Sequence, residues 1–410
     1  MRCETWSVRR ARTTVLVAAA VGLLTRMLIA ANKPGPADVH IFRGFAAAIA
    51  RYGPIRIYEQ PLPGLPVYNH PPLAGWILLG LNELSELGIP FGSLIRAPAS
   101  IADFCCALLV FEIVRRRRSS GAAVACGVGV ALSPVLIATS GYHGNTDAVA
   151  ITFALASAHL LVDRKAPLAA GLAAALSISV KFIPVVTLPA LFVVALRAGR
   201  PAVLRFTAAF TALIALVWGP VLATVPQHLE ENVLEYAGGD YRLWGIVRFA
   251  DLAGLPDSFI TFVQGDGHFL FVLACAAAGV WLALLRPAQL PVVVAFTMGL
   301  LLFLSTASAL QYLTWAAAGL FVIGFWEGAA YSCLLGLTAI LGYMGRSAVR
   351  WSETVMHLGE AGWAVLAVGL ACGVRAILAA TPSAPAPPCA AGPAPLTAPR
   401  ASRPAGSPVR

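Results

Sequence analysis

Long apolar runs, repeated along the chain, constrain its fold more than any other feature. Clear examples are Thr13–Ala31, Val203–Val225 and Ala361–Ala380. A helix of about 20 residues spans the hydrocarbon layer of a membrane, and helices satisfy their own backbone polar groups there. The charged fraction of 12% is about half that of an average soluble protein. The sequence therefore predicts an all-α, polytopic integral membrane protein.

Basic clusters beside the apolar runs predict the orientation of the chain. Arg9, Arg10 and Arg12 precede the first run, and Arg115–Arg118 follow the second. Such clusters favour the cytoplasmic side, so both termini are expected in the cytoplasm, beneath a plasma membrane. The net charge of +10 is then explained by membrane-edge clusters rather than by nucleic-acid binding. About twelve spans result: Thr13–Ala31, Leu94–Val114, Ala122–Ala138, Ala148–Val162, Leu168–Phe182, Ile183–Leu196, Val203–Val225, Phe269–Leu285, Val292–Ser305, Tyr312–Phe325, Tyr331–Tyr343 and Ala361–Ala380.

The chain divides into one multi-span membrane domain, residues 1–380, and a tail, residues 381–410. The tail is rich in Pro, Ala and Ser without apolar periodicity, which predicts a disordered cytoplasmic segment. Two outer segments of the domain, 32–93 and 226–267, exceed the usual loop length and indicate function. The first contains amphipathic stretches, Val39–Tyr52 and Ala74–Leu87, that we expect to lie along the outer interface.

Polar side chains of chemical interest gather on the predicted outer side of the membrane. The segment Ser140–Asp147 places a histidine, an asparagine and an aspartate between two spans, and Lys181 stands at the outer end of another. Polar groups at membrane depth are costly and usually functional. The candidate residues are Asp38, Tyr68, His70, His143, Asn145, Asp147, Lys181, Arg242, Gln311, Tyr312 and Arg346.

The order of several short elements resembles the GT-C superfamily of glycosyltransferases, especially the polytopic mannosyl- and glucosyltransferases that use polyprenyl-phosphate sugars. The resemblance runs from Asp38 to Trp315. It departs from the common pattern in having a single Asp38 rather than an Asp-x-Asp pair, and Asn145 where Gln is commoner. The elements are Asp38, Gly53–Tyr58, Tyr68–Leu73, Gly144–Asp147, Lys181–Pro189 and Gln311–Trp315.

The resemblance implies transfer of a hexose, for which we expect mannose, from a polyprenyl-phosphate donor. The acceptor is expected on the outer face as a glycolipid, polysaccharide or protein, and the reaction to invert the anomeric carbon. Asp38 is the expected base for the acceptor hydroxyl. Positive groups are needed at the departing phosphate, and no cofactor or divalent metal is expected. Phosphate and sugar contacts are assigned to Lys181, His143, Arg242, Arg346, Tyr68, His70, Asn145, Asp147, Gln311 and Tyr312.

Structural alternatives exist for each of these residues. Asp38 or Asp147 could cap a helix, and Lys181 could extend towards lipid phosphate without a catalytic part. The tryptophans Trp76, Trp244, Trp315 and Trp351 are typical of membrane-interface anchors. At the level of the whole protein, the alternative functions are a polytopic transporter and a flippase or ligase for lipid-linked sugars.

Overall fold

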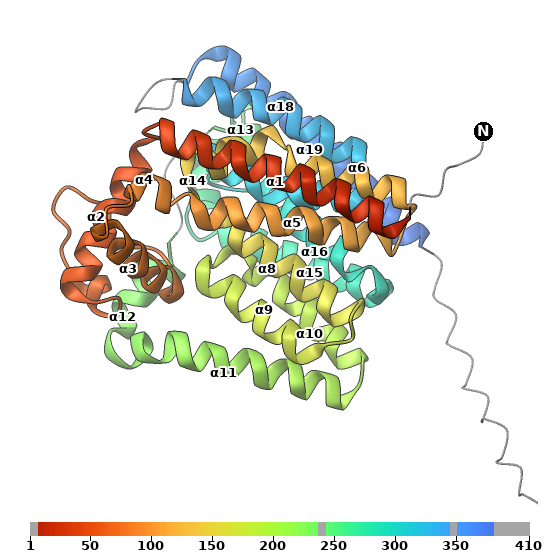
Figure 1. Ribbon diagram of the computed structural model, residues 1–410, viewed down its shortest axis with the longest axis horizontal. Coiled ribbons are helices and arrows are strands. Elements are labelled where there is room, and N and C mark those ends of the chain that lie inside the picture. The colour runs from red at the N-terminus through yellow and green to blue at the C-terminus, as the bar shows by residue number, and fades with distance from the viewer. Residues whose placement is uncertain (1–6, 237–242, 345–350, 381–410) are drawn as a thin grey trace, which may run out of the picture. The chain divides into compact units, whose positions relative to one another are not determined.

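The computed structural model describes residues 7–236, 243–344 and 351–380 (Figure 1). These residues form helices and no strands. Contacts group the described residues into one unit. The tail 381–410, and the candidates Arg242 and Arg346, lie outside the described residues, so their predicted roles stay predictions.

The described part of the chain contains apolar helices at every predicted span, which confirms the all-α polytopic fold. Seven are long enough to cross a membrane, and five others have 10–17 residues. The count of about twelve crossings stays a prediction because of these shorter helices. The long ones are Val8–Asn32 (α1), Phe91–Arg115 (α4 and α5), Ser120–His143 (α6, α7 and η2), Arg200–Thr224 (α11), His268–Leu285 (α15), Phe325–Tyr343 (α18) and Glu353–Ala379 (α19). The shorter ones are Asp147–Val162 (α8), Pro167–Val180 (α9), Ile183–Arg197 (η3 and α10), Pro287–Phe303 (η5 and α16) and Leu310–Ile323 (η6 and α17).

Small residues allow the helices to approach closely, as they do in membrane bundles. A Cβ atom at Gly171 of α9 would lie 2.2 Å from the carbonyl oxygen of Phe206 in α11. Some large apolar side chains of the long helices, in contrast, point outward: Leu216 of α11 is 72% exposed and Leu273 of α15 is 64% exposed. Exposed leucines on membrane-length helices are the surface that lipid would cover.

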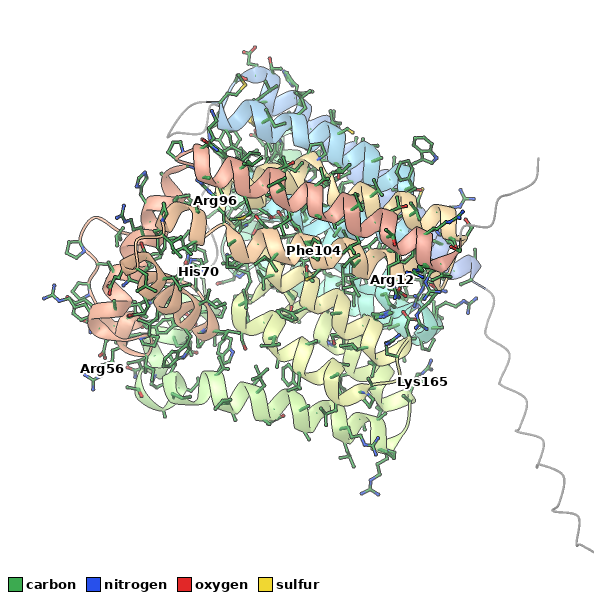
Figure 2. All side chains as sticks on the ribbon, in the orientation of Figure 1. Arg12, Arg56, His70, Arg96, Phe104 and Lys165 are labelled. Atoms are coloured by element: carbon green, nitrogen blue, oxygen red, sulfur yellow. The ribbon has the colours of Figure 1, made fainter. Side chains whose placement is uncertain are left out.

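The two ends of the bundle differ in their side chains. Figure 2 shows Arg12 and Lys165 at one end and Arg56 and His70 at the other. The first end also carries the bidentate pair of Arg117 with Asp163, at 2.9 Å for both contacts. The helices therefore run between a basic end and an end built from the long first loop. The sequence likewise predicts that the basic clusters lie on one side of the membrane and the first loop on the other.

The first loop folds into two helices, α2 (Ala37–Tyr52) and α3 (Pro72–Glu86), close to the predicted amphipathic stretches. They pack on each other and on a short helix, α12 (Pro226–Leu229), that follows α11 (Figure 1). Their shared core contains Phe45, Ile49 and, from α11, Trp218. This core fixes the start of α2, where Asp38 lies.

A buried ion pair ties α1 to α5 inside the bundle. Arg26 Nε lies 3.1 Å from Asp103 Oδ2, the two side chains are 1% and 2% exposed, and Arg26 also donates to the Ala131 carbonyl at 2.9 Å. Removing one partner leaves an uncompensated buried charge, whereas an apolar pair of similar volume is tolerated.

Arg26→Met is therefore expected to destabilise the protein by about 3–5 kcal/mol, and adding Asp103→Leu should restore most of that loss. Thermal unfolding of the single and double variants in detergent measures both effects. A single variant that melts with the wild type would contradict this account of the pair.

Candidate active site

Asp38 and His143, separated widely in the sequence, meet at the loop end of the bundle. Asp38 lies in the first turn of α2, whose N-cap is Pro36, so the alternative that Asp38 caps this helix is wrong. Its Oδ2 lies 3.0 Å from His143 Nε2. The His143 side chain is 4% exposed and that of Asp38 39%. The carboxylate of Asp38 is thus held by a buried histidine and remains partly accessible to solvent.

Tyr343, at the end of α18, completes a chain of hydrogen bonds behind Asp38. Its hydroxyl lies 2.9 Å from His143 Nδ1. An ionised carboxylate only accepts hydrogen bonds, so Nε2 of His143 is protonated and donates its N–H to Asp38. In the neutral ring, Nδ1 then accepts the Tyr343 hydroxyl. The sequence reasoning missed Tyr343, because an aromatic residue at a helix end is also typical of an interface anchor.

The surroundings keep Asp38 ionised and His70 neutral. Burial opposes ionisation of Asp38, but the hydrogen bond from His143 and the charge of Lys181 lower its pKa below the ordinary value of 3.8. Burial, and secondarily the charge of Lys181, lowers the pKa of His70 to about 3. At neutral pH the site therefore presents a carboxylate beside an uncharged imidazole.

Asp147 organises a second cluster next to the first. Its Oδ2 accepts from Trp315 Nε1 at 2.7 Å and from Asn145 Nδ2 at 2.8 Å, and its Oδ1 lies 3.5 Å from Lys181 Nζ. Asn145 also donates to the Gln311 carbonyl at 3.3 Å. The Asp147 side chain is 1% exposed, so these partners replace the water that an ionised carboxylate would lose on burial.

The structure also corrects two of the structural alternatives, helix capping by Asp147 and membrane anchoring by two of the tryptophans. The Asp147 carboxylate receives side-chain donors instead of capping α8, for which Thr146 is the N-cap. Trp315 is only 5% exposed and Trp244 only 1%, so neither is the interface anchor that the sequence predicted. Trp76 and Trp351, in contrast, are 48% and 38% exposed, as an anchor requires.

A cavity of about 210 Å³ adjoins the second cluster. Lys181, Tyr312 and Trp315 line it on one side, with Asn69 and Pro71 from the first loop. Tyr312 and Trp315 are stacked, with ring centroids 4.7 Å apart. The rest of the lining is mainly apolar: Phe182, Ile183, Val185, Val233, Leu234, Phe269, Phe271, Val272, Leu301 and Leu304. The cavity thus combines one ammonium group with a wall suited to a hydrocarbon chain.

Tyr68 and His70 lie behind the cavity lining rather than in it. His70 stacks on Phe42 with ring centroids 5.2 Å apart, and its carbonyl accepts the Tyr58 hydroxyl at 2.8 Å. Tyr68 is 1% exposed and packs edge-on against Phe45 and Tyr58. These aromatic contacts position the segment that carries Asn69; a direct contact of Tyr68 with a sugar stays a prediction.

Among the described residues, no group of three or more His, Cys, Asp or Glu side chains is arranged to hold a metal ion. The candidates that the structure does bring together are Asp38 with His143, and Asp147 with Asn145, Lys181 and the Gln311 backbone. The charge of Lys181 is also one of the causes that lower the pKa of Asp38.

Comparison with known proteins agrees with part of this description. Residues 69–223 match the family model described as dolichyl-phosphate-mannose-protein mannosyltransferase. This segment includes the Pro71-Pro72 element, Asp147 and Lys181, and it bears out the predicted resemblance for that part of the chain. A crystal structure of ArnT from Cupriavidus metallidurans bound to undecaprenyl phosphate is similar at 13% identity and a TM-score of 0.49, with 89% of this chain and 76% of that chain covered. No curated protein matches the sequence.

Proposed function

We propose that the protein is a membrane glycosyltransferase that moves a hexose from a polyprenyl-phosphate donor to an acceptor hydroxyl, with inversion. The observation that carries the proposal is an accessible carboxylate, Asp38, whose pKa is lowered in part by the charge of Lys181, which itself lines a cavity with an apolar wall. The family match over residues 69–223 supports the same class of reaction.

Asp38 is suited to accept the proton of the acceptor. In the proposed step the acceptor oxygen bonds to the anomeric carbon while the bond from that carbon to the phosphate oxygen breaks. The bonding electrons leave with the phosphate, and the hydroxyl proton passes to Asp38. A sugar phosphodiester is already activated, so a carboxylate with a lowered pKa suffices. The hydrogen bond from His143 orients this base.

Lys181 is suited to neutralise the departing phosphate. Its ammonium lines the cavity and is held 3.5 Å from Asp147, so its position is set before the donor binds. Preorganised positive charge in a poorly hydrated site stabilises developing negative charge strongly. The apolar wall below it fits the prenyl chain, and the stacked Tyr312 and Trp315 offer an aromatic surface to the sugar.

Mannose is the hexose that we propose, in line with the family description. We also propose that the loop end of the bundle faces outward, because the basic clusters lie at the opposite end (Figure 2). The acceptor would then be a glycolipid, polysaccharide or protein outside the cytoplasm of a cell with this protein in its plasma membrane.

Donor choice tests the proposal. The purified protein, reconstituted in liposomes, is offered synthetic polyprenyl-phosphate mannose, glucose or arabinose with a membrane lipid extract as acceptor. Release of polyprenyl phosphate from the mannose donor, together with label in a new lipid product, is the expected result. Release from none of the donors would favour a transporter or flippase.

The pH dependence of transfer should report the contact between Asp38 and His143. The pKa of Asp38 is lowered, so the ionised base is present above that pKa and is lost as the pH falls through it. Lys181 and His70 also face Asp38. His143→Ala removes the hydrogen bond but leaves the burial, and should therefore move the acidic limb of the rate profile to higher pH.

The control for this profile is His357→Ala, because His357 pairs with Glu360 rather than with Asp38 and its side chain is 72% exposed. The acidic limb of the rate profile, measured from about pH 3 to 8, should shift for His143→Ala alone. Superimposable profiles for all three proteins would exclude His143 from setting the ionisation of the base.

A further inference from the structure

Arg96 bridges the two chain segments that deliver Asp38 and His143. It lies where α4 meets α5, near the end of α1, and is labelled in Figure 2. The side chain is 0% exposed. An arginine removed from solvent in this way needs partners for its donors, and the identity of those partners indicates its role.

The guanidinium of Arg96 binds the backbone that leads to Asp38. Nη1 donates to the carbonyls of Ala30 and Lys33 at 3.0 and 2.8 Å, and Nη2 donates to the carbonyl of Pro34 at 2.7 Å. These carbonyls belong to the end of α1 and to the connection to α2. The planar fork of an arginine suits several fixed acceptors, which a lysine ammonium cannot match.

The same side chain packs against the residues on either side of His143. Its Cζ lies 6.0 Å above the ring of Tyr142. A Cβ at Gly144 would lie 2.8 Å from Arg96 Cγ, and a Cβ at Gly35 would overlap with Nη2. Both glycines have positive φ, 84° and 83°, so the backbone on each side fits closely around Arg96 only where no side chain is present.

We propose that Arg96 is a positioning residue that sets the distance between Asp38 and His143; this inference rests on the proposed transfer reaction. Arg96 is fully buried and three of its N–H donors go to backbone carbonyls, so we assign it a role in positioning rather than in phosphate binding. Its effect passes through the contact of 3.0 Å between the side chains of Asp38 and His143.

The substitution that tests this role is Arg96→Lys, which keeps the charge and removes the fork. Displacing a reacting group by about 1 Å can slow a reaction about a hundredfold, so we expect kcat to fall roughly ten- to a hundredfold. The KM for the polyprenyl-phosphate donor should stay within about twofold, because Lys181 and the cavity are untouched. Arg56→Lys, an exposed arginine of the same loop, is the matched control and should leave both parameters unchanged.

A double-mutant cycle with His143→Ala separates positioning from general destabilisation. If Arg96 acts through the contact of Asp38 with His143, then Arg96→Lys should slow the His143→Ala protein much less than it slows the wild type. If Arg96→Lys does not fold, Gly35→Ala, which displaces the guanidinium from the same carbonyls, takes its place in the cycle.

The outcomes separate failure of this inference from failure of the proposed function. A wild type that transfers no sugar would remove the reaction on which the inference rests. A wild type that transfers sugar, with Arg96→Lys at the same kcat, would overturn the inference alone. Additive losses in the cycle, or a loss confined to donor KM, would overturn it as well.

Discussion

Asp38→Asn is expected to lower the rate of sugar transfer by at least about a hundredfold, because general base catalysis contributes about 10²–10⁴ to such steps. The asparagine keeps the shape of the side chain and its contact with His143 but has no carboxylate to take the acceptor proton. Donor binding should persist, since Lys181 and the cavity lining are unchanged. Initial rates with labelled donor, and donor affinity measured separately, distinguish these effects.

Asp257→Asn is the matched control for Asp38. Asp257 is an exposed aspartate in the first turn of α14 (Asp257–Gln264), a short helix in the later predicted outer loop. Its replacement should leave transfer unchanged. A fully active Asp38→Asn protein would remove Asp38 from the role of base, whatever the control shows.

Lys181→Met is expected to lower transfer by about 10²–10³, the range for removing one preorganised charge donor from a transition state. The methionine keeps the length and the apolar part of the side chain, so the cavity wall is retained. Lys181→Arg keeps a positive charge at this position and should therefore retain part of the rate that Lys181→Met loses. Rates with the polyprenyl-phosphate donor test both variants.

Loss of Lys181 also leaves the buried Asp147 without its cation, so a fall in rate needs a separate control for folding. Lys181→Met combined with Asp147→Asn removes both charges and should fold better than Lys181→Met alone while staying inactive. Lys165→Met, at the opposite end of the bundle (Figure 2), should be fully active. Recovery of transfer in the double variant would show that Lys181 acts only as a partner for Asp147.

The spans could be predicted from sequence because their signal is local. Each apolar run is a property of consecutive residues, and a continuous run of about 20 apolar residues spans a membrane as a helix, which satisfies its own backbone groups. The two helices of the first loop follow from the same kind of pattern, since an amphipathic stretch has one apolar face wherever it packs.

The sequence predicts candidate residues for the site but not the contacts between them. Asp38, His143 and Lys181 are candidates because each is a polar residue at a predicted outer surface. Their hydrogen bonds depend on how α2 packs against the bundle, which no local pattern contains. The tryptophans show the limit clearly: Trp315 has the sequence character of an anchor, and only the fold reveals that its N–H donates to Asp147.

Arg96 was missed for a related physical reason. In sequence it is one arginine near the start of the predicted span Leu94–Val114, where a basic residue usually indicates an aqueous boundary. The acceptors that explain its burial are backbone carbonyls of Ala30, Lys33 and Pro34, which come from a different part of the chain. Every residue has a backbone carbonyl, so the residue types in a sequence do not indicate which carbonyls will accept a hydrogen bond.

Cleavage of the donor separates the proposed reaction from lipid transport most directly. The measurement uses polyprenyl-phosphate mannose labelled differently in the sugar and in the phosphate, and follows both labels with wild-type and Asp38→Asn protein in liposomes. We expect one polyprenyl phosphate released for each sugar transferred by the wild type, and neither product from Asp38→Asn. Movement of the intact donor between leaflets, with both labels still on one lipid, would contradict it.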